Sequence, residues 1–321
     1  MGDWLQSLTG GVDSGIHWFT TLWPAGTFLS WHFNVTSMVA IILVALICGM
    51  VGSLVVGNRM AFFSDALAHC AFAGVALGLL IALFNRIPVR DFTAWIQLIM
   101  VVFGIAIGLG IAWVRDKTSL ANDTVIGVFF AGAIGLGALV MKGVRTGFPL
   151  ESFLFGGPLE ASPADLLKLG ALLLVTLAVL GWNYNSLVFT SFNASLARSR
   201  QVPIRFSNYL FIALLGLIVN LCLSIVGALL INALLIVPAA TAANVSRNMR
   251  QQFWLSVVLC LAFGIVGHIL SWEIQIPDPT SHEPIQFGIS GIIVVLSVVA
   301  FFISMAVGPM LRRRASAPPL P

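Results

Sequence analysis

Charged residues are scarce in this sequence of 321 residues: Asp, Glu, Lys and Arg together make up 9% of it. Soluble domains carry roughly a quarter charged residues, so this chain cannot cover a water-facing surface. Hydrophobic residues make up 59%, and mean hydropathy is +1.02. The net charge of +4 supplies too few cations for a nucleic-acid-binding surface. The composition therefore excludes a soluble two-domain protein and predicts an all-α, polytopic membrane protein.

Motifs of common catalytic sites are absent as well. The sequence has no GxxxxGK[ST] phosphate-binding loop, so the chain cannot hydrolyse ATP by that route. It has no HExxH pair and no GxSxG elbow, and we expect no enzyme. Its four cysteines lie in apolar runs without a Cys-x-x-Cys pair and are interpreted as packing residues. No Lys or Arg precedes Arg59, which excludes the basic n-region of a cleavable signal peptide and predicts that the first span is retained.

Long apolar runs recur along the chain. A helix needs about 20 mainly apolar residues to cross the hydrocarbon core. The seventh run is the weakest, because it follows the sixth almost without a turn and carries Asn232 and Pro238, so it is either a span or a broken, re-entrant helix. We therefore predict eight or nine transmembrane helices. The candidate runs are Val35–Val56, Ala61–Phe84, Thr93–Val114, Thr124–Met141, Leu166–Trp182, Ser207–Val226, Ala228–Val245, Phe253–Ser271 and Phe287–Val307.

The basic residues indicate which loops face the cytoplasm, where Lys and Arg are enriched. The N-terminus lies outside with nine crossings and inside with eight. We predict three parts: an interfacial segment at 1–34 with four tryptophans, a transmembrane domain at 35–307 and a basic cytoplasmic tail at 308–321. With the C-terminal arginines inside and nine spans, eleven of the 16 basic residues are cytoplasmic: Arg59, Arg115, Lys117, Arg198, Arg200, Arg205, Arg247, Arg250, Arg312, Arg313 and Arg314.

One span carries a compact pair of ionisable side chains, Asp65 and His69. Four-residue spacing places them on one helix face, and ionisable residues inside a span are functional candidates by default. A carboxylate oxygen and an imidazole nitrogen together suit zinc, manganese or ferrous iron rather than magnesium or calcium. Two ligands are too few for a closed structural site, which fits an ion that must be released. The alternative is an Asp–His pair that neutralises itself inside the bundle.

Two further segments are candidates for moving parts. The largest cytoplasmic loop, 192–205, carries three positive charges and no acid; it is either a short helix that docks into a partner's groove or a plain basic loop. The second segment runs from Ile225 to Ala242 and contains Gly227 and Pro238. A proline inside a span removes a hydrogen bond and bends the helix. This segment is therefore either a gating element that lines a pathway or a static kink.

Other polar and small residues give weaker signals. His268, in the eighth span, either lines a pathway or packs as a satisfied histidine. The external loop Trp272–Gln286 attracts cations, contacts an extracellular partner or is merely solvated; its ionisable residues are Glu273, Asp278, His282 and Glu283. Small residues that recur every four positions indicate close packing of helix backbones: Ala66, Cys70, Gly74 and Gly78.

These segments, in this order, resemble the membrane permease of bacterial ABC importers for zinc, manganese and iron. The stretch from Ser64 to His69 is similar to that family's GD-x-x-x-H motif, with Ser64 where the family often has glycine. The resemblance covers roughly Val35 to Val307. Further similar segments follow in the family's order: Asn122–Gly127, Leu154–Gly156, Pro163–Leu166, Val226–Leu230 and Pro238–Ala242.

The resemblance implies a type II ABC importer-like permease in the bacterial cytoplasmic membrane, a homodimer with its translocation path on the dimer axis. It also implies a cytoplasmic ATP-binding subunit and an extracytoplasmic metal-binding protein as partners, with no nucleic acid. Asp65 and His69 match the family's cation-coordinating pair. No bound cofactor is implied beyond the transported metal and the ATP of the partner subunit. The residues that match the family's coupling region are Ser195, Leu196, Ala197, Arg198, Gln201, Val202 and Pro203.

The expected function is therefore ATP-driven import of a divalent transition-metal cation: zinc, manganese or iron. The competing hypothesis is a partner-independent secondary transporter for a cation or small solute, which would depend on the membrane potential or a proton gradient. The residues alone do not decide which metal is carried, or whether His268 or His282 contacts it.

Overall fold

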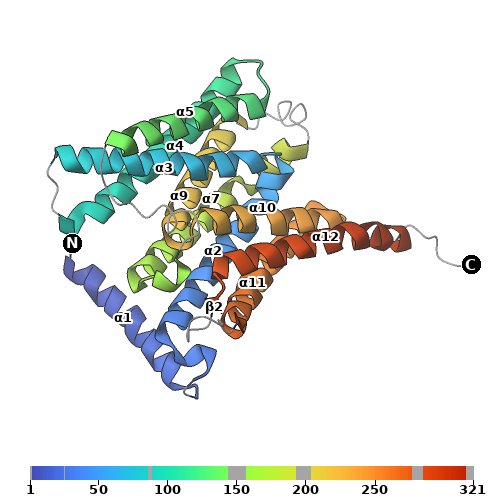
Figure 1. Ribbon diagram of the computed structural model, residues 1–321. Coiled ribbons are helices and arrows are strands. Elements are labelled where there is room, and N and C mark those ends of the chain that lie inside the picture. The colour runs from blue at the N-terminus through green and yellow to red at the C-terminus, as the bar shows by residue number, and fades with distance from the viewer. Residues whose placement is uncertain are drawn as a thin grey trace, which may run out of the picture. The chain divides into compact units, whose positions relative to one another are not determined.

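Membrane-length helices dominate the structure, a computed structural model that describes residues 2–24, 26–85, 89–143, 157–192, 204–276 and 285–315 (Figure 1). The all-α membrane class and the larger of the two predicted helix counts are confirmed for these ranges, because they contain nine helices long and apolar enough to cross a membrane. These helices are α2 (His32–Gly57), α3 (Ala61–Phe84), α4 (Val89–Lys117), α5 (Asn122–Gly143), α7 (Pro163–Phe192), α9 (Ile204–Val226), α10 (Ala228–Val245), α11 (Met249–Glu273) and α12 (Ile289–Ala315).

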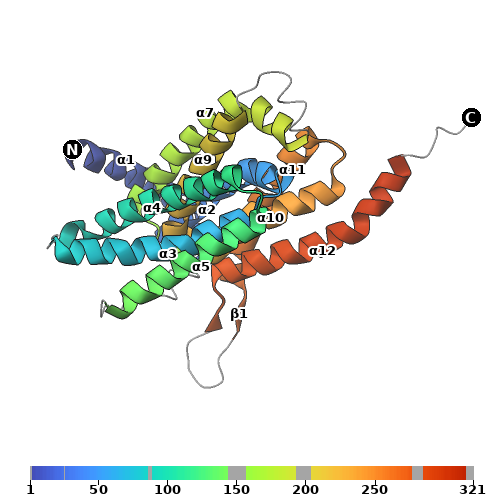
Figure 2. The same cartoon turned by 90° about the horizontal axis from the view of Figure 1, so that it is seen from above.

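Shorter elements lie beside the ends of these spans. The helix α1 (Gly2–Thr21) and the 3-10 turn η1 (Phe28–Ser30) precede α2, and a second turn, η2 (Pro158–Glu160), precedes α7. The two-residue strands β1 (Gln275–Ile276) and β2 (Ile285–Gln286) pair antiparallel between α11 and α12 (Figure 2). The strand pair belongs to the predicted external loop, so the spans themselves remain helical.

A single residue, Gly227, separates α9 from α10. Its φ angle is 87°, a conformation that glycine adopts readily and residues with a side chain rarely do. α10 is then one continuous helix that contains Pro238 in its interior. The expectation that the seventh span could be a broken helix is therefore wrong. The break in helical conformation lies at Gly227, before α10 begins.

The chain forms two compact units, each with its own buried helix contacts. Unit 1 comprises Met1–Val56, Phe155–Val175 and Ile225–Pro321, and unit 2 comprises Gly57–Leu154 and Thr176–Ser224. In unit 1, α2 runs antiparallel to α11, because Ser37 lies beside His268 whereas Gly49, three turns further along α2, lies against Val257. The ends of α2 and α11 that meet are those that the nine-span topology places on the same side of the membrane.

In unit 2, α3 packs against both α4 and α5, and the three helices lie side by side (Figure 1). Gly74 of α3 approaches α4 so closely that a Cβ atom on this residue would lie 2.9 Å from the Cα atom of Met100. On the side facing α5, Cys70 and Ala73 form a buried cluster with Ala133. The small-residue ridge predicted for this helix is therefore a packing surface, as backbone approach between membrane helices requires.

We expect Gly74→Ala to destabilise unit 2, because the added methyl group must displace the backbone at Met100. Overpacking of this kind costs about 1–3 kcal/mol. Thermal unfolding of the detergent-solubilised protein measures the effect. Gly135→Ala, in α5, is the matched control, since its Cβ atom would meet nothing within 4 Å. Equal melting temperatures for the two variants would contradict the close α3–α4 contact.

Candidate functional site

Asp65 and His69 lie on successive turns of α3, on the same face, as their spacing predicted. The Nδ1 atom of His69 is 2.9 Å from the backbone carbonyl oxygen of Asp65 and 3.6 Å from its carboxylate oxygen Oδ1. The two side chains are 36% and 37% exposed. The pair therefore forms a local acid–imidazole unit that keeps access to its surroundings, unlike a pair sealed in the core.

The contact with the carbonyl determines which ring nitrogen of His69 carries the proton. A carbonyl oxygen only accepts, so Nδ1 donates to Asp65 O. In the neutral imidazole, the form that binds metals, Nε2 then keeps the lone pair. Metal-ligating histidines commonly donate their other N–H to a carbonyl in this way, which orients the ring. Joint ligation by Nδ1 and Asp65 Oδ1 would require the metal to displace the Nδ1 proton.

An aromatic ring from a neighbouring helix packs beside His69. The Phe130 ring of α5 has its centroid 5.2 Å from that of His69, and Phe62 lies 6.4 Å from Phe130 on the side of α3. This contact restricts the rotation of the imidazole. Sequence reasoning missed Phe130, because an aromatic residue in an apolar run carries no signal of the helix against which it packs.

The coordination sphere offered by the described part of one chain is incomplete. Among these residues, no group of three or more His, Cys, Asp or Glu side chains could hold a metal ion. A zinc site that exchanges its ligands typically leaves at least one position open, and a site with two protein ligands leaves more. The arrangement can therefore take part in binding a cation, but it cannot enclose one.

Several predicted positions lie outside the described residues. They are the coupling residues Ser195, Leu196, Ala197, Arg198, Gln201, Val202 and Pro203, and the loop residues Asp278, His282 and Glu283. Their roles stay predictions. Glu273, the last residue of α11, is exposed.

The segment around Pro238 is braced by α11 within unit 1. Pro238 has no N–H to donate to the carbonyl of Leu234, four residues earlier. The thiol of Cys260, which is fully buried, donates to that carbonyl instead, with Sγ 3.1 Å from the oxygen. Freed carbonyl groups at membrane depth are tolerated only against protein or a polar cavity, and here the partner is protein. A gating role for Gly227 and Pro238 remains a prediction.

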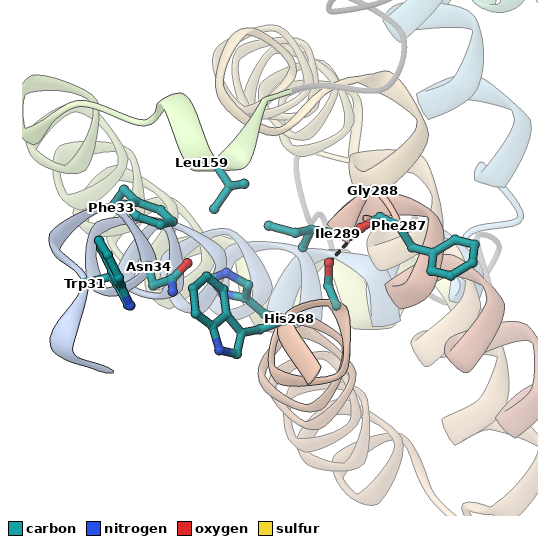
Figure 3. A pocket seen from close by; sticks show the side chains of 10 residues that line it. Trp31, Phe33, Asn34, Leu159, His268, Phe287, Gly288 and Ile289 are labelled. Carbon is teal, nitrogen blue, oxygen red and sulfur yellow. Dashed lines mark hydrogen bonds between the residues drawn. The ribbon is translucent and has the colours of Figure 1, made fainter. Parts of the chain in front are cut away.

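His268 is packed inside unit 1. It is 1% exposed, its Nε2 atom lies 3.4 Å from Ser37 Oγ, and its ring meets Phe28 edge-to-face at 4.9 Å. It also lines a cavity together with Trp31 and other residues near the ends of α2, α11 and α12 (Figure 3). Aromatic residues rather than acidic ligands surround it in the described part of the chain. This environment is that of a packing histidine beside a cavity.

The nine apolar helices of the described residues define a class of protein, a multi-pass membrane protein. The chain belongs to the ABC 3 transport family, whose model matches residues 30–308. The permease fold implied by the resemblance is confirmed, as is a multi-pass location in the cytoplasmic membrane.

Named relatives and a solved structure agree with this membership. The manganese transport system membrane protein MntC of Halalkalibacterium halodurans is 32% identical over 75% of this chain and 78% of its own length. The high-affinity zinc uptake system membrane protein ZnuB of Haemophilus influenzae is 29% identical over 72% of this chain and 84% of its own. PsaBC from Streptococcus pneumoniae in complex with Fab superposes with a TM-score of 0.69 at 24% identity, covering 88% of this chain and 94% of that one.

We expect Cys260→Ala to destabilise unit 1, because it leaves the Leu234 carbonyl buried without its donor. An unsatisfied buried acceptor costs about 1–3 kcal/mol. Cys260→Ser keeps a donor and is the matched control. In a Pro238→Ala background the backbone N–H at position 238 returns, so Cys260→Ala should have a smaller effect there. Thermal unfolding of the unchanged protein, Cys260→Ala, Pro238→Ala and the double variant measures this coupling. The same loss of stability from Cys260→Ala in both backgrounds would contradict the thiol's role.

Proposed function

We propose that this chain is the membrane permease of an ATP-driven importer for a divalent transition-metal cation, with zinc, manganese and iron as candidate cargoes. The observation that carries the proposal is the family match over residues 30–308. Relatives named for manganese transport and zinc uptake support the cargo class. The partly exposed pair of Asp65 and His69 supports it independently, because carboxylate and imidazole ligands suit these metals.

ATP hydrolysis is assigned to a separate ATP-binding subunit. The sequence of this chain lacks a GxxxxGK[ST] loop, so the energy must reach it from a partner. The coupling residues that match the family, from Ser195 to Pro203, are the proposed contact with that subunit. Movement of this contact would switch the side of the membrane to which the pair of Asp65 and His69 is open.

Two further partners follow from the loose binding expected of a site with only two ligands, Asp65 and His69. A transport site must bind its ion loosely enough to release it, so capture of a scarce metal is assigned to an extracytoplasmic metal-binding protein. Asp65 and His69 supply only two ligands, whereas zinc prefers four. A second copy of the chain would contribute the same two residues, and the homodimer would then complete a four-ligand site on its axis.

Uptake measurements with single variants test the proposal. Asp65→Ala and His69→Ala should each lower metal accumulation by about tenfold or more, since loss of even a supporting group costs 10–100-fold in metal affinity. Cells that express the chain with its ATP-binding subunit are grown with limiting zinc or manganese, and their metal content is measured. His17→Ala changes an exposed histidine of α1 and is the matched control.

A conservative variant separates ligation from folding. His69→Cys should shift the preference from manganese towards zinc, because a thiolate is the softer ligand; a purely structural His69 would change both metals equally. Full uptake by both alanine variants at normal membrane levels would overturn the site. Uptake that persists without an ATP-binding subunit and follows the proton gradient would overturn ATP-driven import.

A further inference from the structure

The cavity in unit 1 has an aromatic wall. It encloses about 410 Å³, and three of its lining residues, Trp31, Phe33 and Trp272, are in mutual contact, with ring centroids 5.8–6.5 Å apart. Figure 3 shows Trp31 and Phe33 on one side of the cavity and His268 on another. The faces of tryptophan and phenylalanine rings attract ammonium groups. The wall is therefore suited to an organic cation.

Charges around the cavity favour the same ligand. None of the lining residues is a lysine, arginine, aspartate or glutamate. Two exposed acids, Glu160 and Glu273, directly follow the lining residues Leu159 and Trp272 in the chain. An approaching ammonium group thus meets no competing cation among the lining residues.

His268 lines the cavity and has one polar atom without a partner among the described residues. Its Nδ1 atom is buried and has no partner in the described part of the chain. When Nε2 carries the proton and donates to Ser37 Oγ, Nδ1 keeps a lone pair that can accept. Buried polar groups are normally hydrogen-bonded, so this atom indicates a donor that is supplied from outside the chain. A primary ammonium group is such a donor.

An apolar groove continues from the cavity. Phe287 and Gly288 line both spaces, and the groove of about 570 Å³ then follows α12 to Val299 beside the last turn of α11. Figure 3 shows the Phe287 side chain pointing away from the other labelled residues of the cavity. From Gly288 to Val299 a helix rises about 16 Å, close to half of the hydrocarbon core of about 30 Å. The groove has the length of a lipid chain within one leaflet.

We propose that unit 1 binds a phospholipid with a primary amine head group, such as phosphatidylethanolamine, in the leaflet at the predicted outer side. The ammonium group lies against Trp31, Phe33 and Trp272 and donates to His268 Nδ1, and one acyl chain lies in the groove along α12. Tryptophans at this level match the aromatic belts found at membrane interfaces. The site uses no residue of the Asp65–His69 pair.

Lipid retention by the full-length protein tests this site. The chain is reconstituted in vesicles of phosphatidylethanolamine and phosphatidylglycerol, extracted in mild detergent, and its bound lipids are counted by native mass spectrometry. Wild-type protein should retain phosphatidylethanolamine in preference to phosphatidylglycerol. Gly291→Leu fills the groove, because its Cβ atom meets nothing within 4 Å. It should lower retention about tenfold, the equivalent of about 1.4 kcal/mol.

Matched controls make the outcome specific. Gly181→Leu adds the same side chain at an exposed glycine of α7 that also has open space around it, and it should leave retention unchanged. Trp31→Leu should weaken the preference for the amine head group, whereas Trp18→Leu in α1 should not; these tryptophans are 47% and 67% exposed. Equal retention in all variants, or a preference for phosphatidylglycerol, would overturn the proposal.

Discussion

A backbone N–H or C=O group without a partner is expensive inside hydrocarbon, and this constraint shapes the helices of the chain. Pro238 withdraws a donor from the Leu234 carbonyl, and the Cys260 thiol replaces it from the next helix. Gly227 is the single residue between α9 and α10, and its φ angle of 87° suits a residue without a side chain, so little backbone is left outside a helix there. The carbonyl that Pro238 leaves free is thus satisfied by a specific neighbour.

Two histidines that look alike in the sequence have different surroundings in the structure. His69 and His268 both lie in apolar spans near small residues. His69 is partly exposed and donates to its own helix, which leaves a nitrogen for a metal. His268 is 1% exposed and contacts Ser37 and Phe28 instead. Burial and the partner of each nitrogen, rather than residue type, distinguish the partly exposed histidine proposed as a cation ligand from the buried one beside a cavity lined by aromatic rings.

Sequence patterns predicted the spans well because the length of an apolar run is a one-dimensional property. The predicted runs Ala61–Phe84 and Ala228–Val245 coincide with α3 and α10. α12 instead extends to Ala315, past the predicted end at Val307, because hydropathy marks where a helix leaves the bilayer rather than where it ends. The face shared by Asp65 and His69 was predictable for the same reason, since helical periodicity is local.

Contacts between helices were beyond the reach of such patterns. The Phe130 ring beside His69 and the Cys260 thiol at the Leu234 carbonyl depend on how two distant segments pack. Cys260 was interpreted as a packing residue, and its position is buried as expected, but its hydrogen bond depends on a proline 22 residues earlier in the chain. Only the packed structure brings the donor to the acceptor that the proline leaves free.

Charge balance connects the pair of Asp65 and His69 to the proposed homodimer. Metal ligation requires an ionised Asp65 and a neutral His69, so one chain would supply one negative charge and could not neutralise a divalent cation. Two chains together present two carboxylates, which match the charge of the ion. Without an ion, two like charges close together are destabilised, and a monovalent cation compensates only half of them. A site of this kind would favour divalent over monovalent cations through charge, while its imidazoles favour transition metals over magnesium and calcium.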